Sequence, residues 1–497
     1  MFLTPEDKYT SSFFAVCISL IVFFIFGTLL TVKYYSFGYY DWDLAFFSQA
    51  SWNLIHGRPF VSLVGINFFG DHSYFFMAFF LPFFGIFHSP LVLIYAKLLA
   101  FIIAGYLFFL YAEKRLGGRI GILFLIMYFL FPPNIFGLLY EFNPEAFAPP
   151  VIFLMFLALD NRKFKELFFW SIVLMTIKEN MALVAFMFSL WALVIADKKD
   201  KLFLGVFAVF CLAVFIYLTA FWVPSLRGLG HHAFTVRYPQ LGSNALEVAL
   251  SPFLKPREVF GALTTAQNGF YLFEIFGIFS GLAILTPWPV FLMAPLLLQH
   301  CLSSHFPEHT IFYHYGPTMA PFVFIAAVHT LFRISRFNKG KFLKNVLLAV
   351  LLGGTFVSAF SYRADFFLRL NIHNEVDIPA EWAMIKSIPQ DASVVATFKY
   401  LAPLSVRDNL YSFHMVYDRA FQDLSGMRRS ELNVGKAFSL PVNVEYALID
   451  WNDSWLLGAL LNDKDKVLER INAFLKKSPW RVVRQENKSI LLRRDIH

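Results

Sequence analysis

Two aspartates stand where the first apolar segment of the chain ends. Asp41 and Asp43 follow an apolar run over residues 12–32 and precede an aromatic, amphipathic stretch over 44–55. A charged side chain at the centre of a bilayer costs at least ~2.5–3.5 kcal/mol, so these acids are expected to face water. One carboxylate could act as a general base or metal ligand while the other holds the loop. The alternative is that Asp43 only caps the helix expected over 44–55.

An acid–imidazole pair, Asp71-His72, ends the same polar loop. A carboxylate beside a histidine can orient the imidazole toward a metal or an anionic ligand. Asp71 could equally cap the helix that follows, which would leave His72 with a structural role.

Two further polar groups interrupt apolar runs. Glu141 and Glu145 flank Asn143 and would present a second acidic patch, which could line a site or bind a metal. Lys178 and Glu179 break a later run. Lys178 could contact a phosphate, or it could pair with Glu179 in a tight polar turn.

Histidines and arginines gather in two later connections. In the run from His305 to Tyr315, His309 could help His305 and Glu308 to bind a divalent cation, although no His-Glu-x-x-His pattern is present. Tyr313 and His314 stand where the next apolar run begins, a place where membrane proteins carry aromatic belts.

The 223–269 loop is the second of these connections. Arg227, Arg237 and the pair His231-His232 could clamp an anionic lipid head group, and solvated surface charges are the alternative.

The composition indicates what positions these residues. The chain has 497 residues, of which 58% are hydrophobic and 15% charged, with a mean hydropathy of +0.58. Such a composition is typical of a polytopic protein of the lipid bilayer. The net charge of +8 resides in short connections and reflects topology, so we expect no nucleic-acid partner. The three cysteines lie in apolar segments and indicate neither a disulfide nor a thiol site.

Apolar runs predict eleven membrane spans. They lie near 12–32, 90–112, 119–139, 146–159, 167–178, 181–196, 202–222, 270–285, 287–302, 316–333 and 344–361. Basic residues cluster around 114–119, 162–165, 198–201 and 333–344, and the positive-inside rule places all four clusters in the cytoplasm. With a cytoplasmic N-terminus this parity requires 74–87 to be a juxtamembrane or re-entrant helix. The polar groups above then all face the outside, in one long first loop and four later connections.

A more polar segment follows residue 361. Residues 392–398 and 444–450 are β-branched and bounded by turn formers, 465–477 has helical spacing, and 480–493 predicts a hairpin turning at Glu486-Asn487. We therefore expect a mainly α chain with a transmembrane domain over 1–361 and a small extracytoplasmic α/β domain over 362–497.

Several of these residues carry a family resemblance. The run from Tyr40 to Leu44, with Gln49, Trp52-Asn53 and His56-Gly57, resembles the opening signature of a bacterial and archaeal membrane family of unknown function. Later landmarks continue in the same order over most of the chain: Asp71-His72, Phe142 to Glu145, Lys178-Glu179, Tyr313 to Tyr315, Ser393 to Val395 and Tyr446 to Asp450. One departure is visible, because Asn143 stands where the family usually carries a histidine. This substitution could alter activity.

The layout of that family is similar to the GT-C glycosyltransferases. The resemblance implies an acidic residue in a long first external loop, a second acidic site in the next loop, and an inverting transfer of sugar from a polyprenyl-phosphate carrier. Asp41 or Asp43 would then deprotonate or position the acceptor. Lys178, Arg227, Arg237, His72 or a divalent metal ion would stabilise the leaving phosphate.

The sequence therefore predicts an integral glycosyltransferase of the inner (plasma) membrane. A transporter or flippase for a lipid-linked or small solute is the first alternative, and it predicts polar residues deep within spans and two repeated halves. A non-catalytic assembly protein is the second, and it predicts that the acids at 41, 43, 141 and 145 are dispensable. The sugar, the acceptor and the metal requirement are not specified by these residues.

Overall fold

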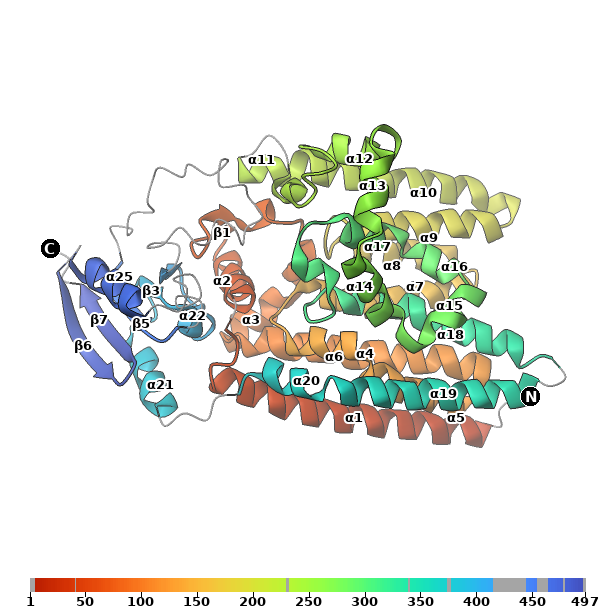
Figure 1. Cartoon of the computed structure of the whole chain (residues 1–497), viewed down its shortest axis with the longest axis horizontal. Coiled ribbons are helices and arrows are strands. Elements are labelled where there is room, and N and C mark those ends of the chain that lie inside the picture. The colour runs from red at the N-terminus through yellow and green to blue at the C-terminus, as the bar shows by residue number, and fades with distance from the viewer. Residues whose placement is uncertain are drawn as a thin grey trace.

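The structure, a computed structural model, describes residues 5–40, 42–228, 232–337, 340–372, 377–413, 444–453, 464–476 and 479–494. A bundle of helices fills one part of an elongated molecule, and a small β-sheet caps one end of it (Figure 1). We call the end of the bundle nearest the sheet the site end. The N-terminus lies at the opposite end (Figure 1).

Among the described residues, five helical segments are long and apolar enough to cross a membrane. They are Tyr9–Tyr35 in α1 (Pro5–Tyr35), α4 (Leu91–Leu116), Lys198–Arg227 with α10 (Lys198–Tyr217) and α11 (Val223–Arg227), Gly316–Ile334 with α18 (Ala320–Ile334), and α19 (Gly340–Ser361). A sixth candidate is the pair α5 (Gly118–Leu130) and α6 (Pro132–Leu139), bent by 49°. Pro132 explains the bend, because proline removes a helical N–H and disfavours helical geometry in the preceding residue.

The other predicted spans coincide with shorter helices. These are α7 (Ala148–Asp160), α8 (Phe164–Met175), α9 (Met181–Ile195), α14 (Ala266–Phe276), α15 (Ser280–Leu285), α16 (Trp288–Leu292) and α17 (Ala294–Leu302). Prolines and glycines divide them: Gly277 between α14 and α15 has a φ of +44°, and Pro287 and Pro289 flank the start of α16. The predicted positions therefore hold, whereas the count of eleven spans is supported only roughly.

The long first loop contains short elements that lie between the bundle and the sheet (Figure 1). They are α2 (Asp43–Ile55), the antiparallel pair β1 (Phe60–Val61) and β2 (Ile66–Asn67), and a short helical segment ending in α3 (Leu81–Phe87). The segment Phe75–Phe87 has 13 residues, fewer than a straight span needs, in agreement with a juxtamembrane helix. Asp43 does not cap α2, because it is already the first helical residue and Trp42 holds the cap position.

The C-terminal region is a mixed five-stranded sheet in the order β4-β3-β5-β7-β6. β3 (Val394–Ala396) pairs in parallel with β4 (Leu410–Ser412) and β5 (Tyr446–Asp450), and β6 (Trp480–Glu486) and β7 (Ser489–Arg494) form the predicted hairpin. Helices α21 (Ile378–Ser387), α22 (Phe398–Leu404) and α25 (Lys464–Lys476) accompany it. The division at residue 361 stays a prediction, and α20 (Arg363–Leu370) packs against α6 and α1 of the bundle.

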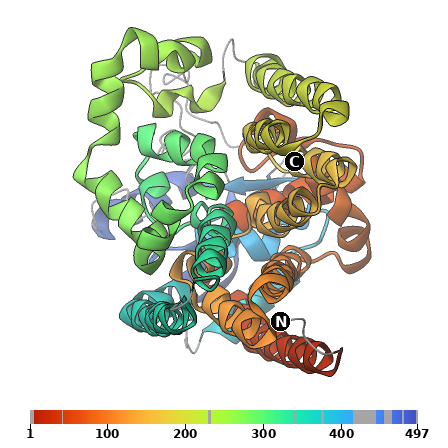
Figure 2. The same ribbon diagram turned by 90° about the vertical axis from the view of Figure 1, so that its right-hand side faces the viewer.

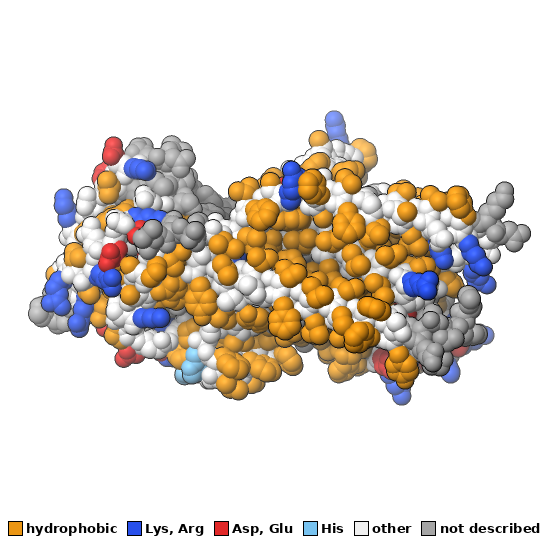
Figure 3. Space-filling view, turned by 90° about the horizontal axis from the view of Figure 1, so that it is seen from below, with side chains coloured by type: hydrophobic (Ala, Val, Ile, Leu, Met, Phe, Trp, Pro, Cys, Tyr) orange, Lys and Arg blue, Asp and Glu red, His pale blue; other side chains and the backbone are white. Residues whose placement is uncertain are grey.

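The surface shows why this is a membrane protein. On the face drawn in Figure 3, hydrophobic side chains cover the middle of the molecule, and charged ones gather mainly toward its two ends. Seen from the end opposite the sheet, the long helices run roughly along the line of sight (Figure 2). Exposed Phe24, Phe210 and Phe356 belong to three of the candidate spans, where lipid replaces water as the surrounding medium.

The candidate functional site

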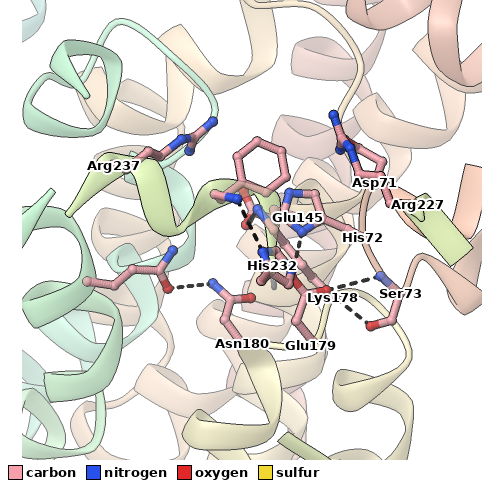
Figure 4. Close-up of polar contacts among 12 residues, drawn as sticks. Asp71, His72, Ser73, Glu145, Lys178, Glu179, Asn180, Arg227, His232 and Arg237 are labelled. Atoms are coloured by element: carbon pink, nitrogen blue, oxygen red, sulfur yellow. Dashed lines mark hydrogen bonds and ion pairs between the residues drawn. The ribbon is translucent and has the colours of Figure 1, made fainter. Parts of the chain in front are cut away.

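Connections that are far apart in the sequence meet at the site end of the bundle. They bring together a buried set of ionisable side chains that we call the charged cluster, part of which Figure 4 draws. Its members are Asp71, His72, Glu145, Lys178, Glu179, Arg227, His232, Arg237, Glu308 and His314. The sequence predicted most of these residues separately, and the structure gives them their partners.

Lys178 and Glu145 form the central ion pair. The Lys178 Nζ lies 2.8 Å from Glu145 Oε1, and both side chains are buried. The His314 Nε2 lies 3.4 Å from the other oxygen of Glu145. Burial alone would raise the pKa of Glu145, but Lys178 and His314 lower it to about 2. Asn143 accepts a hydrogen bond from the Glu145 amide and so caps the short 3-10 helix Pro144–Phe147.

Glu179 and Lys178 have different partners, so the alternative in which these two neighbours pair in a tight polar turn does not hold. The Glu179 Oε1 lies 2.5 Å from His72 Nδ1 and 3.4 Å from His232 Nε2. Its Oε2 accepts hydrogen bonds from the Ser73 amide at 3.0 Å and the Ser73 hydroxyl at 3.2 Å. Lys178 and Glu179 lie in the turn that precedes α9, and their side chains serve two separate groups of partners (Figure 4).

The two arginines also have carboxylate partners. Arg227 lies 3.3 Å from Asp71, and Arg237 pairs with Glu308. Asp71 therefore holds an arginine instead of capping a helix. Both guanidinium groups are largely buried, and no described residue accepts a hydrogen bond from the Nε of either one. Each arginine therefore keeps one buried N–H donor without a partner among the described residues.

The side chains that could have helped to bind a cation around His309 have other partners in the structure. The His309 Nδ1 lies 2.7 Å from Asn268 Oδ1 and its Nε2 lies 2.6 Å from the Ser303 carbonyl, while Glu308 faces Arg237. His309 and Glu308, which the sequence offered as metal ligands, are therefore engaged by other protein groups. Tyr313 lies against Arg369, whose guanidinium carbon is 4.9 Å from its ring centroid, and is not part of the charged cluster.

The predicted acids of the first loop form a neighbouring group. Asp43 Oδ2 accepts a hydrogen bond from the Tyr140 hydroxyl at 3.2 Å, and Glu141 Oε2 accepts one from the Leu44 amide at 2.9 Å. Glu141 thus fastens the start of α2 to the loop after α6. Asp41 and His231 lie outside the described residues.

Two buried lysines hold this group in place, and sequence reasoning missed both. The Lys97 Nζ donates to the carbonyls of Tyr140 and Glu141 at 2.6 and 3.0 Å, and the Lys33 Nζ donates to those of Leu139 and Arg369. Lys97 interrupts the apolar run over 90–112 and Lys33 directly follows the run over 12–32, which is the signal that could have revealed them.

A small cavity of about 20 Å³ lies beside residues of both groups. It is lined by Lys97, Phe101, Tyr128, Asn134, Gly137, Leu138, Glu141, Asn143, Ala146, Pro149, His314 and Pro317. Three predicted site residues, Glu141, Asn143 and His314, therefore share one cavity wall. No described residue is a hydrogen-bond partner for His314 Nδ1 or Asn134 Oδ1.

The fold is similar to that of a solved membrane protein. The crystal structure of ArnT from Cupriavidus metallidurans bound to undecaprenyl phosphate aligns with a TM-score of 0.51 and 13% sequence identity, over 96% of this chain and 97% of that one. Its apo structure aligns with a TM-score of 0.51 and 12% identity, over 98% of each chain. These likenesses confirm the GT-C-like fold predicted from the sequence.

A search of proteins of curated function gives no match. A comparison with models of protein families does, and it confirms the family resemblance. The model of the family described as "Predicted membrane protein (DUF2079)" matches residues 33–487, which is most of the chain and includes every residue of the charged cluster. The chain therefore belongs to the DUF2079 family of predicted membrane proteins.

Proposed function

We propose that this protein is an integral membrane glycosyltransferase that moves a sugar from a polyprenyl-phosphate donor to an acceptor on the extracytoplasmic face. The observation that carries the proposal is the charged cluster, which buries charged groups from several connections at one end of a GT-C-like bundle. Ion pairs of this kind add little to stability when the whole pair is buried, so their concentration in one place favours a functional role. The similar fold of ArnT bound to undecaprenyl phosphate supports a polyprenyl phosphate as the carrier.

The first-loop acids suit the activation of an acceptor. Asp43 is partly exposed, lies at the start of α2 and is held by the Tyr140 hydroxyl. An acceptor hydroxyl beside it would lose its proton to the carboxylate as the bond to the sugar forms, and the polyprenyl phosphate would leave. Asp41, two residues earlier, is the alternative base.

The cations of the charged cluster suit the leaving group. Negative charge develops on the phosphate oxygen as the glycosidic bond breaks, and fixed donors in a water-poor site stabilise it well. No described residue accepts a hydrogen bond from the Nε of Arg227 or Arg237. Asp71 and Glu308 hold the two guanidinium groups in position. Lys178 is held in position by Glu145.

Transfer from a labelled donor tests the proposal. Membranes would carry wild-type protein, Asp41→Asn, Asp43→Asn or the control Asp160→Asn at matched expression, with a radiolabelled sugar on a polyprenyl phosphate. Asp160 pairs with Arg115 at the opposite end of the bundle. We expect the wild type and the control to transfer the sugar, and one of the first-loop variants to lose about 100-fold or more in rate.

Two other outcomes would contradict this function. Equal turnover by all four proteins would remove Asp41 and Asp43 from the mechanism. Movement of the labelled donor across sealed vesicles without transfer would indicate a flippase, the alternative function in which the same cluster recognises the phosphate.

A further inference from the structure

We propose that His72, Glu179 and His232 form a binding site for one divalent transition-metal ion of the zinc type. The role that we give the ion, support of the leaving phosphate, rests on the proposed transferase function. Its binding does not, and can be measured alone.

The geometry of the three side chains fits a metal centre. One ligand atom from each of them lies within 4.8 Å of the others, and all three residues are buried. Tetrahedral zinc with bonds of ~2.1 Å holds its ligand atoms about 3.4 Å apart. The 3.4 Å between His232 Nε2 and Glu179 Oε1 already matches that spacing. The 2.5 Å contact between His72 Nδ1 and Glu179 would lengthen as the ion replaces the shared proton.

The donor set selects the class of metal. Two imidazoles and one carboxylate suit zinc and neighbouring transition metals, whereas magnesium and calcium prefer oxygen ligands throughout. Three protein ligands also leave a fourth position open, as in catalytic zinc sites. A phosphate oxygen could occupy it.

The surroundings hold the ligands in place. Ser73 donates two hydrogen bonds to the Glu179 oxygen that faces away from the histidines. The His72 ring stacks on Phe234, with ring centroids 4.5 Å apart and planes 2° from parallel. Such second contacts orient metal ligands. The Phe234 amide lies 3.4 Å from His232 Nδ1, and this long contact must open so that Nδ1 can carry the proton when Nε2 binds a metal.

Charge provides an independent argument. Among its described members, the charged cluster contains three fixed cations and four carboxylates, which leaves it one negative charge when the histidines are neutral. The cations are Lys178, Arg227 and Arg237, and the carboxylates are Asp71, Glu145, Glu179 and Glu308. A divalent ion on Glu179 reverses the sign of this net charge and so adds to the attraction of Lys178, Arg227 and Arg237 for the leaving phosphate.

Zinc binding by the purified full-length protein tests the site. Wild type, Glu179→Gln, His232→Gln and the control His329→Gln would be dialysed against buffered zinc and analysed for metal per chain. His329 lies in α18 and contacts Tyr111 at 2.7 Å, outside the cluster. We expect about one zinc per chain in the wild type and the control, and affinity weakened about 100-fold in the other two. Cobalt in place of zinc should give the visible spectrum of a four-coordinate site, and excess magnesium should not displace it.

Thermal unfolding checks that each variant is folded. We expect Glu179→Gln to fold, because its amide oxygen can still accept a hydrogen bond from Ser73. The proposal fails if the dialysed wild type holds no zinc. It also fails if both cluster variants retain as much zinc as the wild type, since the three residues are then only a hydrogen-bonded network. Zinc bound at this site without any sugar transfer would support the metal centre and count against the transferase function.

Discussion

The two ends of the helical bundle both carry ion pairs, but they differ in how these pairs meet water. At the opposite end, Lys163–Glu166 and Arg162–Asp197 have side chains that are more than half exposed. At the site end, the side chains of Lys178 and Glu145 are 7% and 4% exposed. Arg115–Asp160 is an intermediate case at the opposite end, at 13% and 14%.

This difference separates topology from chemistry. Exposed pairs contribute about 0–1 kcal/mol each, so the residues that form them can vary freely. A buried pair is held together because removal of one partner leaves an uncompensated charge, although the intact pair adds little. At the site end, loss of one charged partner would therefore lower the free energy of unfolding strongly, whereas at the opposite end it would lower it little.

The largest test of the comparison removes one lysine at each end. Lys178→Met leaves the buried Glu145 carboxylate without its ion-pair partner, so we expect a loss of about 3–5 kcal/mol in the free energy of unfolding. Lys163→Met should change it by less than about 1 kcal/mol. Unfolding in detergent, followed by tryptophan fluorescence, measures both.

A second substitution sharpens this test. Glu145→Gln combined with Lys178→Met removes both charges, so it should recover most of the lost stability. Equal losses in the two lysine variants would contradict the contrast between the ends.

Acid should act mainly on the site end. The pKa of Glu145 is about 2 in the folded protein and 4.5 ordinarily, so its contribution to stability is full above pH 4.5 and disappears as the pH falls toward 2. The loss amounts to about 3 kcal/mol. We expect Glu145→Gln to lack this part of the acid dependence when unfolding midpoints are compared between pH 5 and pH 2.5 in roughly half-unit steps. Parallel curves for the two proteins would show that Glu145 is not held ionised by its neighbours.

Packing differs between the ends as well. A Cβ added to Gly137 in α6 would overlap the ring of Pro317 beside the cavity, whereas one added to Gly205 in α10 meets nothing within 4 Å. Gly137→Ala should therefore destabilise the protein by about 1–3 kcal/mol. Gly205→Ala should be neutral or slightly stabilising, because alanine favours a helix. The same unfolding assay compares them, and an unchanged Gly137→Ala would mean that α6 and Pro317 separate easily.

Much of the fold was predictable because hydrophobic runs and turn formers act locally. The sequence located the helices of the bundle, β3, β5, α25 and the β6–β7 hairpin, whose turn includes Asn487 at a φ of +31°. It did not locate β4, which has three residues and depends on pairing with β3. The number of spans was harder to predict from the sequence, because the positions of short helices such as α16 and α17 depend on tertiary packing.

The candidate site was predictable as a set of residues but not as a set of pairs. Topology alone placed the acids and histidines on one side of the membrane. Partners such as Lys178 and Glu145 are 33 positions apart, and no local rule connects them. Sequence reasoning could therefore offer only neighbours as partners, Lys178 with Glu179 in one alternative and His309 with Glu308 in another, and in both cases the structure gives different partners.

The smallest expected effect concerns the contact between the first loop and the sheet. Asp408 accepts hydrogen bonds from Trp52 Nε1 at 2.9 Å and Arg58 Nη2 at 2.6 Å, at a half-exposed position. Asp408→Ala should weaken this contact by about 1 kcal/mol. We expect faster hydrogen exchange in α2, and no change for Asp391→Ala, an exposed acid of the same region. Because α2 begins at Asp43, such loosening should also slow sugar transfer modestly; unchanged exchange in α2 would show that the sheet does not steady the site end.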